Sequence, residues 1–133
     1  PSRIFSKSAF QSGGAGMAGT PADMLRFFEA MRTGGSGVVR QETIARAFSN
    51  QIGNVERDPG QRFGYLGAIV DDPVAANSPS AEGTIQWGGV YGHSWLVDPV
   101  NGLCILSMSN TAVEGCTGRY PKDIIAAVYA DLI

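Results

Sequence analysis

Two adjacent glycines stand inside a segment whose other residues favour a β-strand. The segment runs from Gln86 to Pro99 and holds both tryptophans and the single histidine of the chain. Glycine within a strand is typical of a β-bulge or of a place where a ligand approaches the backbone. If Trp87-Gly88-Gly89 ends an edge-like strand, its exposed N–H groups could bind a carbonyl oxygen that develops negative charge. The spacing alone is equally consistent with a bulge and with such an anion-binding backbone.

His93 and Ser94 are the nearest side chains that could act as a base and a nucleophile. The pattern around Ser94 departs from the nucleophile elbow G-x-S-x-G because Leu96 replaces the last glycine, and because a strand continues where a sharp turn is required. A general base must lie within hydrogen-bond reach of its nucleophile, whereas strand spacing places Tyr91 and Trp95 beside the histidine. We therefore predict that Ser94 is a strand residue and that His93 is packed in the sheet or lies at its rim.

Three further motifs are incomplete. Residues 14–19 match G-x-G-x-x-G and precede a predicted helix, but no apolar strand leads into them, so a structural glycine loop is favoured over a dinucleotide site. Asp71 and Asp72 are adjacent and point to different sides, which predicts solvated loop charges. Neither Lys7 nor Lys122 stands three residues after a serine, so the chain has no Ser-x-x-Lys pair. A nucleophile with its activating base is missing from this sequence.

The composition indicates one globular domain. The chain has 133 residues, of which 44% are hydrophobic and 17% charged, and its net charge is -2. Its few lysines and arginines are scattered, so we expect no nucleic-acid partner. No apolar stretch approaches the roughly 20 residues that span a bilayer, so no membrane span is predicted. Cys104 and Cys116 form no metal or redox motif; Cys104 is predicted to be a buried thiol, and no disulfide, metal or cofactor is expected.

Hydrophobic spacing predicts three helices. Thr20 offers an N-cap hydroxyl before Pro21, and the helix that follows should end at the glycines of residues 34–37 and bury Met24, Phe28 and Met31. A second helix should cover residues 41–48 and bury Ile44, Ala47 and Phe48. The last should begin near Pro121 and carry one apolar stripe of Ile124, Ile125, Val128, Tyr129 and Leu132.

The strands are predicted in the second half of the chain. Residues 62–70 contain two glycines and are expected to form one bent or bulged strand, followed by a surface loop over residues 71–83. A strand from residue 84 should carry its large side chains on one face: Tyr91, His93, Trp95 and Val97. After a turn over residues 98–102, residues 102–110 should return antiparallel as a central strand covered on both faces. Two or three strands and one helix leave sheet edges that this chain cannot cover alone.

Two motif regions occur together and in the same order as in one known family. The first is Ser12-Gly13-Gly14-Ala15-Gly16-Met17 with Gly19-Thr20 and Asp23. The second is Trp87-Gly88-Gly89-Val90-Tyr91-Gly92-His93-Ser94-Trp95 with Asp98-Pro99, Gly102-Leu103 and Asn110-Thr111. Along nearly its whole length the chain resembles the C-terminal part of class C β-lactamase-like serine hydrolases, and most of all the family VIII carboxylesterases.

This resemblance implies an α/β fold of the α+β type, a β-lactamase/penicillin-binding-protein-like antiparallel sheet flanked by helices, of which only the C-terminal portion is present. Residues 1–133 would form that portion of a single domain, with a helical and loop segment over 1–61 and the C-terminal strands and final helix over 62–133. In the family, the serine and lysine of Ser-x-x-Lys and a catalytic tyrosine lie upstream. The start at Pro1 and the uncovered strands then suggest a fragment or one chain of a nicked enzyme, whose partner is the N-terminal remainder of the domain.

The resemblance also assigns roles to the glycine-containing strand. Trp87-Gly88-Gly89 stands where penicillin-recognising enzymes carry Lys-Thr-Gly, and the missing lysine removes the cation that would bind a β-lactam carboxylate. Trp87, Gly88, Gly89 and Tyr91 are implied to contact a small-molecule ester, and the backbone N–H of Val90 is implied to be an oxyanion donor. The expected activity is ester hydrolysis through an acyl-enzyme, with the isolated chain inactive. The alternatives are a β-lactamase or peptidase of the same fold, and a non-catalytic relative that binds a ligand or peptide.

Overall fold

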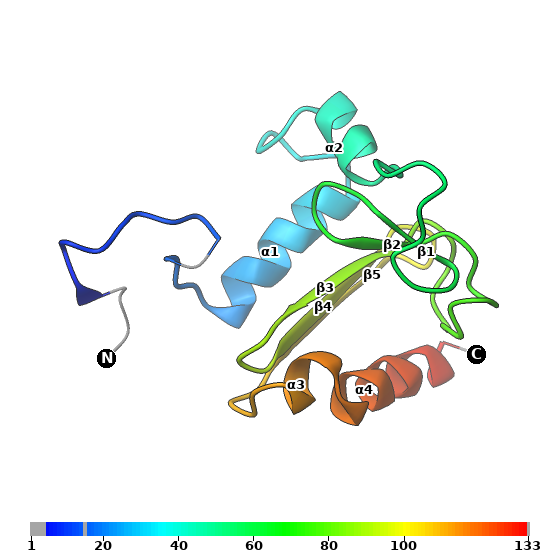
Figure 1. The fold of residues 1–133 in the computed structure, drawn as a ribbon. Helices are drawn as coiled ribbons and strands as arrows, with labels where there is room; N and C mark the ends of the chain where they lie inside the picture. The colour runs from blue at the N-terminus through cyan, green and yellow to red at the C-terminus, as the bar shows by residue number, and fades with distance from the viewer. Residues whose placement is uncertain (1–4, 15, 133) are drawn as a thin grey trace.

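The fold is an antiparallel sheet with helices on both faces. A computed structural model describes residues 5–14 and 16–132. Its five strands lie in the order β1-β2-β3-β4-β5, and they are β1 (Gln61–Phe63), β2 (Ala68–Val70), β3 (Ile85–Gly89), β4 (His93–Asp98) and β5 (Leu103–Met108). Helix α1 (Pro21–Arg32) crosses one face and is followed by α2 (Gln41–Ala47), while α3 (Glu114–Thr117) and α4 (Arg119–Ala130) lie against the other face (Figure 1). The predicted antiparallel sheet flanked by helices is confirmed.

Helix α1 forms as its sequence predicts. The Thr20 side chain caps the helix by accepting a hydrogen bond from the backbone N–H of Asp23, and Pro21 occupies the first turn. The face that carries Phe28 and Met31 is buried. Helix α2 likewise buries Ile44 and Ala47, while Phe48, its C-cap residue, packs at the edge of the core. Within the described residues, no helix is long and apolar enough to cross a membrane.

The core lies between α1 and the middle of the sheet. It is formed by Phe28 of α1 with Ile69, Ile85 and Val97 of three adjacent strands. The ring of Phe28 also stacks on Trp95, with 4.9 Å between the ring centroids. Aromatic pairs at this separation add to the free energy gained by burial. The core therefore fixes α1 against β3 and β4, the two strands that carry the candidate site.

The predicted strand over residues 62–70 is wrong, because these residues form two strands. β1 and β2 pair antiparallel, and the Gly64 N–H donates to the Gly67 carbonyl in the turn between them. Neither glycine has room for a side chain, since a Cβ on Gly64 would lie 2.5 Å from the Ala47 carbonyl oxygen and a Cβ on Gly67 would lie 2.5 Å from the Gln86 carbonyl oxygen. The two glycines thus mark a reversal of the chain rather than a bend in one strand.

The segment from residue 84 also reverses once. β3 and β4 form a hairpin whose turn is residues 90–92, so Tyr91 lies in an exposed turn and not on the strand face where we predicted it. The turn 98–102 is confirmed, with Gly102 at φ +70°. Among the described residues β5 is the last strand of the sheet, so the strand that its predicted central position requires on its outer side is not one of these five. Helix α1 packs against β5, and a strand at the end of a sheet can be covered in this way as well as a central one.

The last helix is longer at its start and shorter at its end than predicted. α4 begins at Arg119 and ends at Ala130, so Leu132 lies beyond it and is exposed rather than part of its apolar stripe. Pro121 and Tyr129 are its buried residues. The Tyr129 hydroxyl donates to the buried carboxylate of Asp98 at 2.5 Å. This hydrogen bond joins the helix to the end of β4.

Asp98 is the centre of a buried hydrogen-bond network. Its carboxylate accepts from the backbone N–H groups of Ala81, Val100 and Asn101, and also from the side-chain amide of Asn101. Burial raises the pKa of this carboxyl, but the hydrogen bonds outweigh burial and hold the pKa below its ordinary value. Burial and the neighbouring carboxylate together raise the pKa of Tyr129 well above its ordinary value. The network joins the loop before β3, the β4–β5 turn and α4.

Candidate functional site

The end of β3 has one free edge. Its pairing with β2 reaches only as far as Ala68↔Gln86, whereas its pairing with β4 continues to Gly89↔His93. The hairpin of β3 and β4 therefore extends past the shorter strands β1 and β2 (Figure 1). On the side of β2, the backbone from Trp87 onwards has no strand beside it among the described residues. An unpaired strand edge presents N–H and C=O groups that can bind another molecule.

The backbone N–H of Val90 points toward this free edge. The Gly89 carbonyl accepts from the Gly92 N–H at 2.9 Å, within the turn on the β4 side. In a trans peptide the C=O and the N–H point in opposite directions, so the N–H of Val90 points away from β4. The alternation along a strand gives the same direction, because residues an even number of positions apart turn their backbone groups to the same side. The carbonyl of Thr84, six residues before Val90, accepts from the N–H of Val70 and so points toward β2. Within residues 5–14 and 16–132 this N–H has no hydrogen-bond acceptor.

Trp87 stands beside this edge as a partly exposed aromatic wall. It shares a face with the buried Ile85, but it lies beyond the core and is 42% exposed. The ring of Phe63 meets it edge-on with 5.0 Å between centroids, and the guanidinium carbon of Arg57 lies 5.1 Å from the centroid of its ring. Such cation–π contacts contribute roughly 0.5–1 kcal/mol at exposed sites. The indole is therefore held in place by contacts from two other segments.

Close neighbours leave no room for a side chain at Gly88 and only tight room for one at Gly89. A Cβ on Gly88 would lie 2.7 Å from the His93 carbonyl oxygen and 2.8 Å from the Cys116 sulfur, and a Cβ on Gly89 would lie 3.3 Å from Nδ1 of His93. The register across this stretch is regular, with Gly88 opposite Ser94. A β-bulge, which the sequence left open, is therefore excluded here. Gly88 instead allows Cys116 of another segment to pack directly on the strand.

His93 and Ser94 take the positions that were predicted for them. Both begin β4, and both are partly buried. Ser94 lies opposite Gly88 in the ladder, as a strand residue. In the described part of the chain the imidazole of His93 has no hydrogen-bonding or ionic partner, so the structure brings it to no nucleophile. Neither residue forms a catalytic pair.

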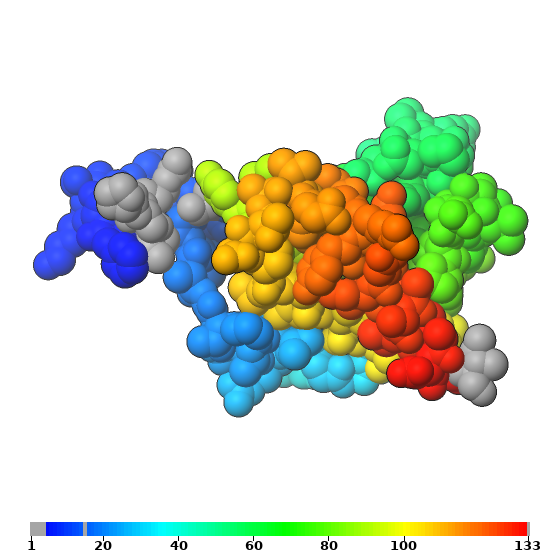
Figure 2. All heavy atoms as spheres, turned by 90° about the horizontal axis from the view of Figure 1, so that it is seen from below, coloured from blue at the N-terminus to red at the C-terminus, as the bar shows by residue number. Residues whose placement is uncertain are grey.

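The remaining sequence motifs lie away from this edge. Residues 14–19 include Ala15, which is outside the described residues; the segment before α1 projects from the body of the molecule (Figures 1 and 2). Asp71 is exposed and pairs with Arg62 at 3.4 Å, while Asp72 accepts from the N–H groups of the following turn. Both acids are thus loop charges with different partners, as predicted. No group of three metal-ligating side chains occurs among the described residues.

The two cysteines are free thiols in different surroundings. Cys104 on β5 is partly buried rather than fully buried, and its sulfur lies 3.7 Å from a carboxylate oxygen of Glu29. Burial and this carboxylate raise the pKa of Cys104 to about 11, so its thiolate is scarce at neutral pH. Cys116 lies in α3 on the opposite face, against Gly88. No sequence pattern predicts this contact, because Cys116 lies 28 positions after Gly88 along the chain.

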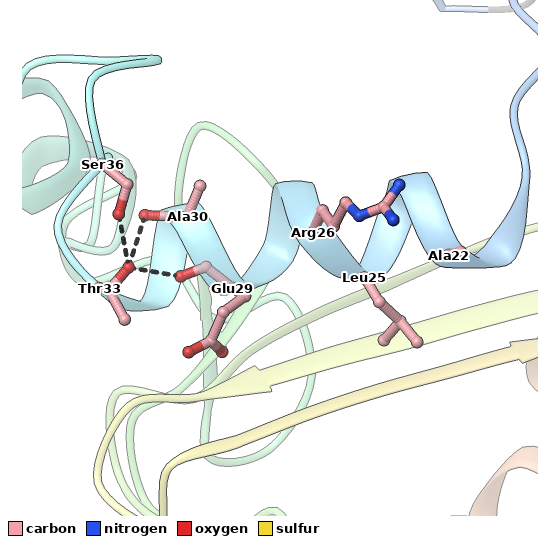
Figure 3. Close-up of a pocket in the computed structure, with 7 residues that line it drawn as sticks. All are labelled: Ala22, Leu25, Arg26, Glu29, Ala30, Thr33 and Ser36. Atoms are coloured by element: carbon pink, nitrogen blue, oxygen red, sulfur yellow. Dashed lines mark hydrogen bonds between the residues drawn. The ribbon is translucent and has the colours of Figure 1, made fainter.

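A shallow hollow runs along one side of α1 and does not include the candidate site. It is lined by Ala22, Leu25, Arg26, Glu29, Ala30, Thr33 and Ser36 (Figure 3). The Thr33 hydroxyl is engaged with the carbonyl of Glu29 at 2.7 Å and with the hydroxyl of Ser36 at 2.8 Å (Figure 3). The hollow therefore presents mainly the side of a helix, and we assign no chemistry to it.

Comparison with known proteins places this geometry in a family. Residues 2–130 match the β-lactamase family. The chain belongs to that family. It is also 48% identical to esterase EstB of Burkholderia gladioli over 98% of its length. The solved structure of EstCE1, described as a hydrolase with promiscuous acyltransferase activity, superposes with a TM-score of 0.88 at 43% identity over 96% of this chain.

The β-lactamase fold is shared by a more distant structure as well. Unliganded simvastatin synthase (LovD) from Aspergillus terreus matches with a TM-score of 0.75 at 17% identity over 90% of this chain. At that identity the likeness concerns the fold alone. The chain spans about a third of the length of its relatives, 33% of EstB and 34% of EstCE1. It corresponds to a C-terminal part of a β-lactamase-family protein, as the sequence motifs indicated.

Proposed function

We propose that this chain is the C-terminal part of a serine hydrolase that cleaves carboxylic esters through an acyl-enzyme. In this proposal Trp87, Gly88 and Gly89 form one wall of the catalytic cleft, Tyr91 contacts the substrate from the turn, and the N–H of Val90 is one donor of the oxyanion hole. The observation that carries the proposal is the free edge of β3, where an N–H that has no acceptor among the described residues points outward beside a partly exposed tryptophan. The names of the relatives, an esterase and a hydrolase, support the same reaction class.

The reaction divides between this chain and the rest of the domain. A serine hydroxyl outside this chain attacks the ester carbonyl, its proton passes to the lysine and tyrosine beside it, and the carbonyl oxygen becomes an anion. The N–H of Val90 donates to that anion, together with the N–H of the serine. Collapse of the intermediate expels the alcohol, which takes up the proton. Water then hydrolyses the acyl-serine by the same steps and releases the carboxylic acid.

The charges around Trp87 support a neutral ester as the substrate. A β-lactam carries a carboxylate, and the lysine that would bind it is replaced here by an indole. Arg57 does reach the indole, but its guanidinium is already paired with the carboxylate of Asp58 and donates to the Gln61 side chain at 3.0 Å. An arginine whose charge is paired within its own loop attracts a second carboxylate only weakly. An apolar acyl or alcohol group on the indole is the better match.

Exposed apolar side chains support a further part of the domain that covers this chain. On the N-terminal side these are Phe5, Phe10, Met17, Leu25 and Phe27. At the free strand end they are Val90, which is 58% exposed, and Tyr91, which is 77% exposed. Large apolar patches on a folded surface are typical of contact sites. We propose that the part carrying the serine, lysine and tyrosine packs on these two regions.

Kinetics of the full-length protein test this function. We expect it to hydrolyse p-nitrophenyl acetate and butyrate, to lose this activity after reaction with a serine-directed phosphonate, and to gain the mass of one phosphonyl group. Residues 1–133 alone should be inactive, because the nucleophile is elsewhere. A protein that neither hydrolyses these esters nor takes up the phosphonate would contradict the proposal and favour the non-catalytic alternative. Faster turnover of nitrocefin than of the esters would favour the β-lactamase alternative.

A further inference from the structure

Val113 has an unusual backbone conformation close to the candidate site. Its φ is 66° and its ψ is -60°, and the N–H of Glu114 donates to the carbonyl of Ala112 at 2.8 Å. These are the marks of a classic γ-turn, which is rare and strained. A β-branched residue at positive φ adds to the strain. Such a conformation costs of order 1–3 kcal/mol and persists only where the surrounding contacts hold it.

The contacts that hold Val113 are made with the β3–β4 turn. The Val113 N–H donates to the carbonyl of Val90 at 2.8 Å. At the other end of the same turn, the carbonyl of Gly92 accepts from both the backbone N–H and the hydroxyl of Ser109, each at 2.9 Å. Gly115 packs so closely there that a Cβ on it would lie 2.7 Å from the Gly92 carbonyl oxygen. Residues 109–116, which we call the brace, thus bind both ends of the turn.

A third contact joins the brace to the strand itself. Cys116, the last residue of the brace, places its sulfur 2.8 Å from the position that a Cβ of Gly88 would occupy. The thiol therefore fills the space that a side chain at residue 88 would otherwise take. Any larger group at residue 116 must push either α3 or the backbone of β3. Beyond Gln86 the strand β3 is paired with β4 alone, so its edge toward β2 is not held by another strand of the described residues.

We propose that the brace positions the N–H of Val90 for the oxyanion, with Val113 and Cys116 as positioning residues; this inference rests on the proposed function. The reason is conformational freedom. Gly88 and Gly89 have no side chains to limit their backbone angles, and β4 holds them along one edge only. The brace supplies the missing restraint, through a hydrogen bond to the Val90 carbonyl and through the thiol under Gly88. The strain at Val113 is kept because relaxing it would release the Val90 carbonyl.

Graded substitution of Cys116 in the full-length protein tests the inference. Cys116→Leu should shift Gly88 and lower kcat for p-nitrophenyl butyrate by about 100-fold, the cost of a misplacement of about 1 Å, with KM changed less than twofold. Cys116→Ser, which keeps the size of the side chain, should keep kcat within about threefold of wild type. The matched control is Cys104→Leu on the other face of the sheet, which should lower the melting temperature and leave kcat unchanged.

A second variant addresses the other contact. Val113→Pro removes the N–H that binds the Val90 carbonyl and cannot adopt a positive φ, so a folded variant should lose kcat as Cys116→Leu does. Cys116→Leu with wild-type kcat would overturn the inference, and so would a loss of kcat that Cys104→Leu matches at the same drop in melting temperature. These outcomes are distinct from failure of the proposed function, because in that case the wild-type protein itself would not hydrolyse the ester.

Discussion

Val90→Pro in the full-length protein is expected to lower kcat for p-nitrophenyl butyrate by about 100- to 1,000-fold, the usual cost of one oxyanion donor. Proline deletes the N–H that points to the free strand edge. That N–H has no acceptor within the described residues, and Val90 does not have a positive φ, so the substitution removes no hydrogen bond of the fold. Gly89 before it lies in a strand, the conformation that a following proline favours.

The kinetic pattern separates this effect from general damage. An interaction made only in the transition state lowers kcat and kcat/KM equally, so KM should stay within about threefold of wild type. Val90→Ala is the matched control, because it shortens the same exposed side chain and keeps the N–H. It should retain at least about a third of wild-type kcat. Equal activity of the proline and alanine variants would show that Val90 donates to no oxyanion.

Asp98→Asn is expected to lower the free energy of unfolding by about 3 kcal/mol, because hydrogen bonds to a charged group contribute roughly 1.5–3 kcal/mol and their loss leaves buried donors unsatisfied. Asp98 is fully buried, and its carboxylate accepts hydrogen bonds from Ala81 in the loop before β3, from Asn101 in the β4–β5 turn and from Tyr129 in α4. The asparagine amide replaces one acceptor oxygen with a donor that faces other donors. Denaturant unfolding of the full-length protein measures the change, and kcat of the folded variant should be unaffected.

The pH dependence gives this prediction a second readout. Since the pKa of Asp98 is lower in the folded than in the unfolded state, its charged form stabilises the fold above the unfolded pKa of about 3.9. The contribution is lost as the pH falls through the lower, folded pKa. The difference between wild type and Asp98→Asn should therefore be constant between about pH 6 and 8 and shrink below about pH 4.

Tyr129→Phe is the control that removes one hydrogen-bond donor of Asp98. It removes only the hydroxyl that donates to the carboxylate and keeps the ring in place. We expect a smaller loss of about 1–2 kcal/mol, because the other donors still satisfy Asp98. Loss of stability from Tyr129→Phe equal to that from Asp98→Asn would contradict the central place of the carboxylate in the network.

Features that depend on neighbouring residues could be predicted from the sequence. The cap of α1 and its buried face follow from a few adjacent side chains, and the turn after Asp98 follows from an Asp-Pro start and an Asn-Gly end. The family resemblance drew attention to Trp87–Val90 where spacing alone left two interpretations open. The regular register of β3 and β4 then removed the β-bulge. The proposed roles of these residues remain predictions.

Features that depend on distant residues could not be predicted. The position of β5 as the last of the five described strands is a matter of strand order, which a run of apolar residues does not specify. The Asp98 carboxylate meets partners 17 and 31 residues away, and Cys116 meets a glycine in another element. The positive φ of Val113 accompanies a hydrogen bond from its N–H to the carbonyl of Val90 in the β3–β4 turn. No local pattern marks these contacts.

A crystal structure of the full-length protein with a serine-bound phosphonate tests the central claim most directly. The phosphonyl oxygen of such an adduct stands in for the anionic oxygen of the tetrahedral intermediate. If the free edge of β3 is one side of the oxyanion hole, that oxygen should lie about 2.7–3.1 Å from the backbone nitrogen of Val90, with the phosphonate substituent against Trp87. An adduct whose oxygen points away from Val90, with other donors around it, would contradict the assignment of this strand to the oxyanion hole.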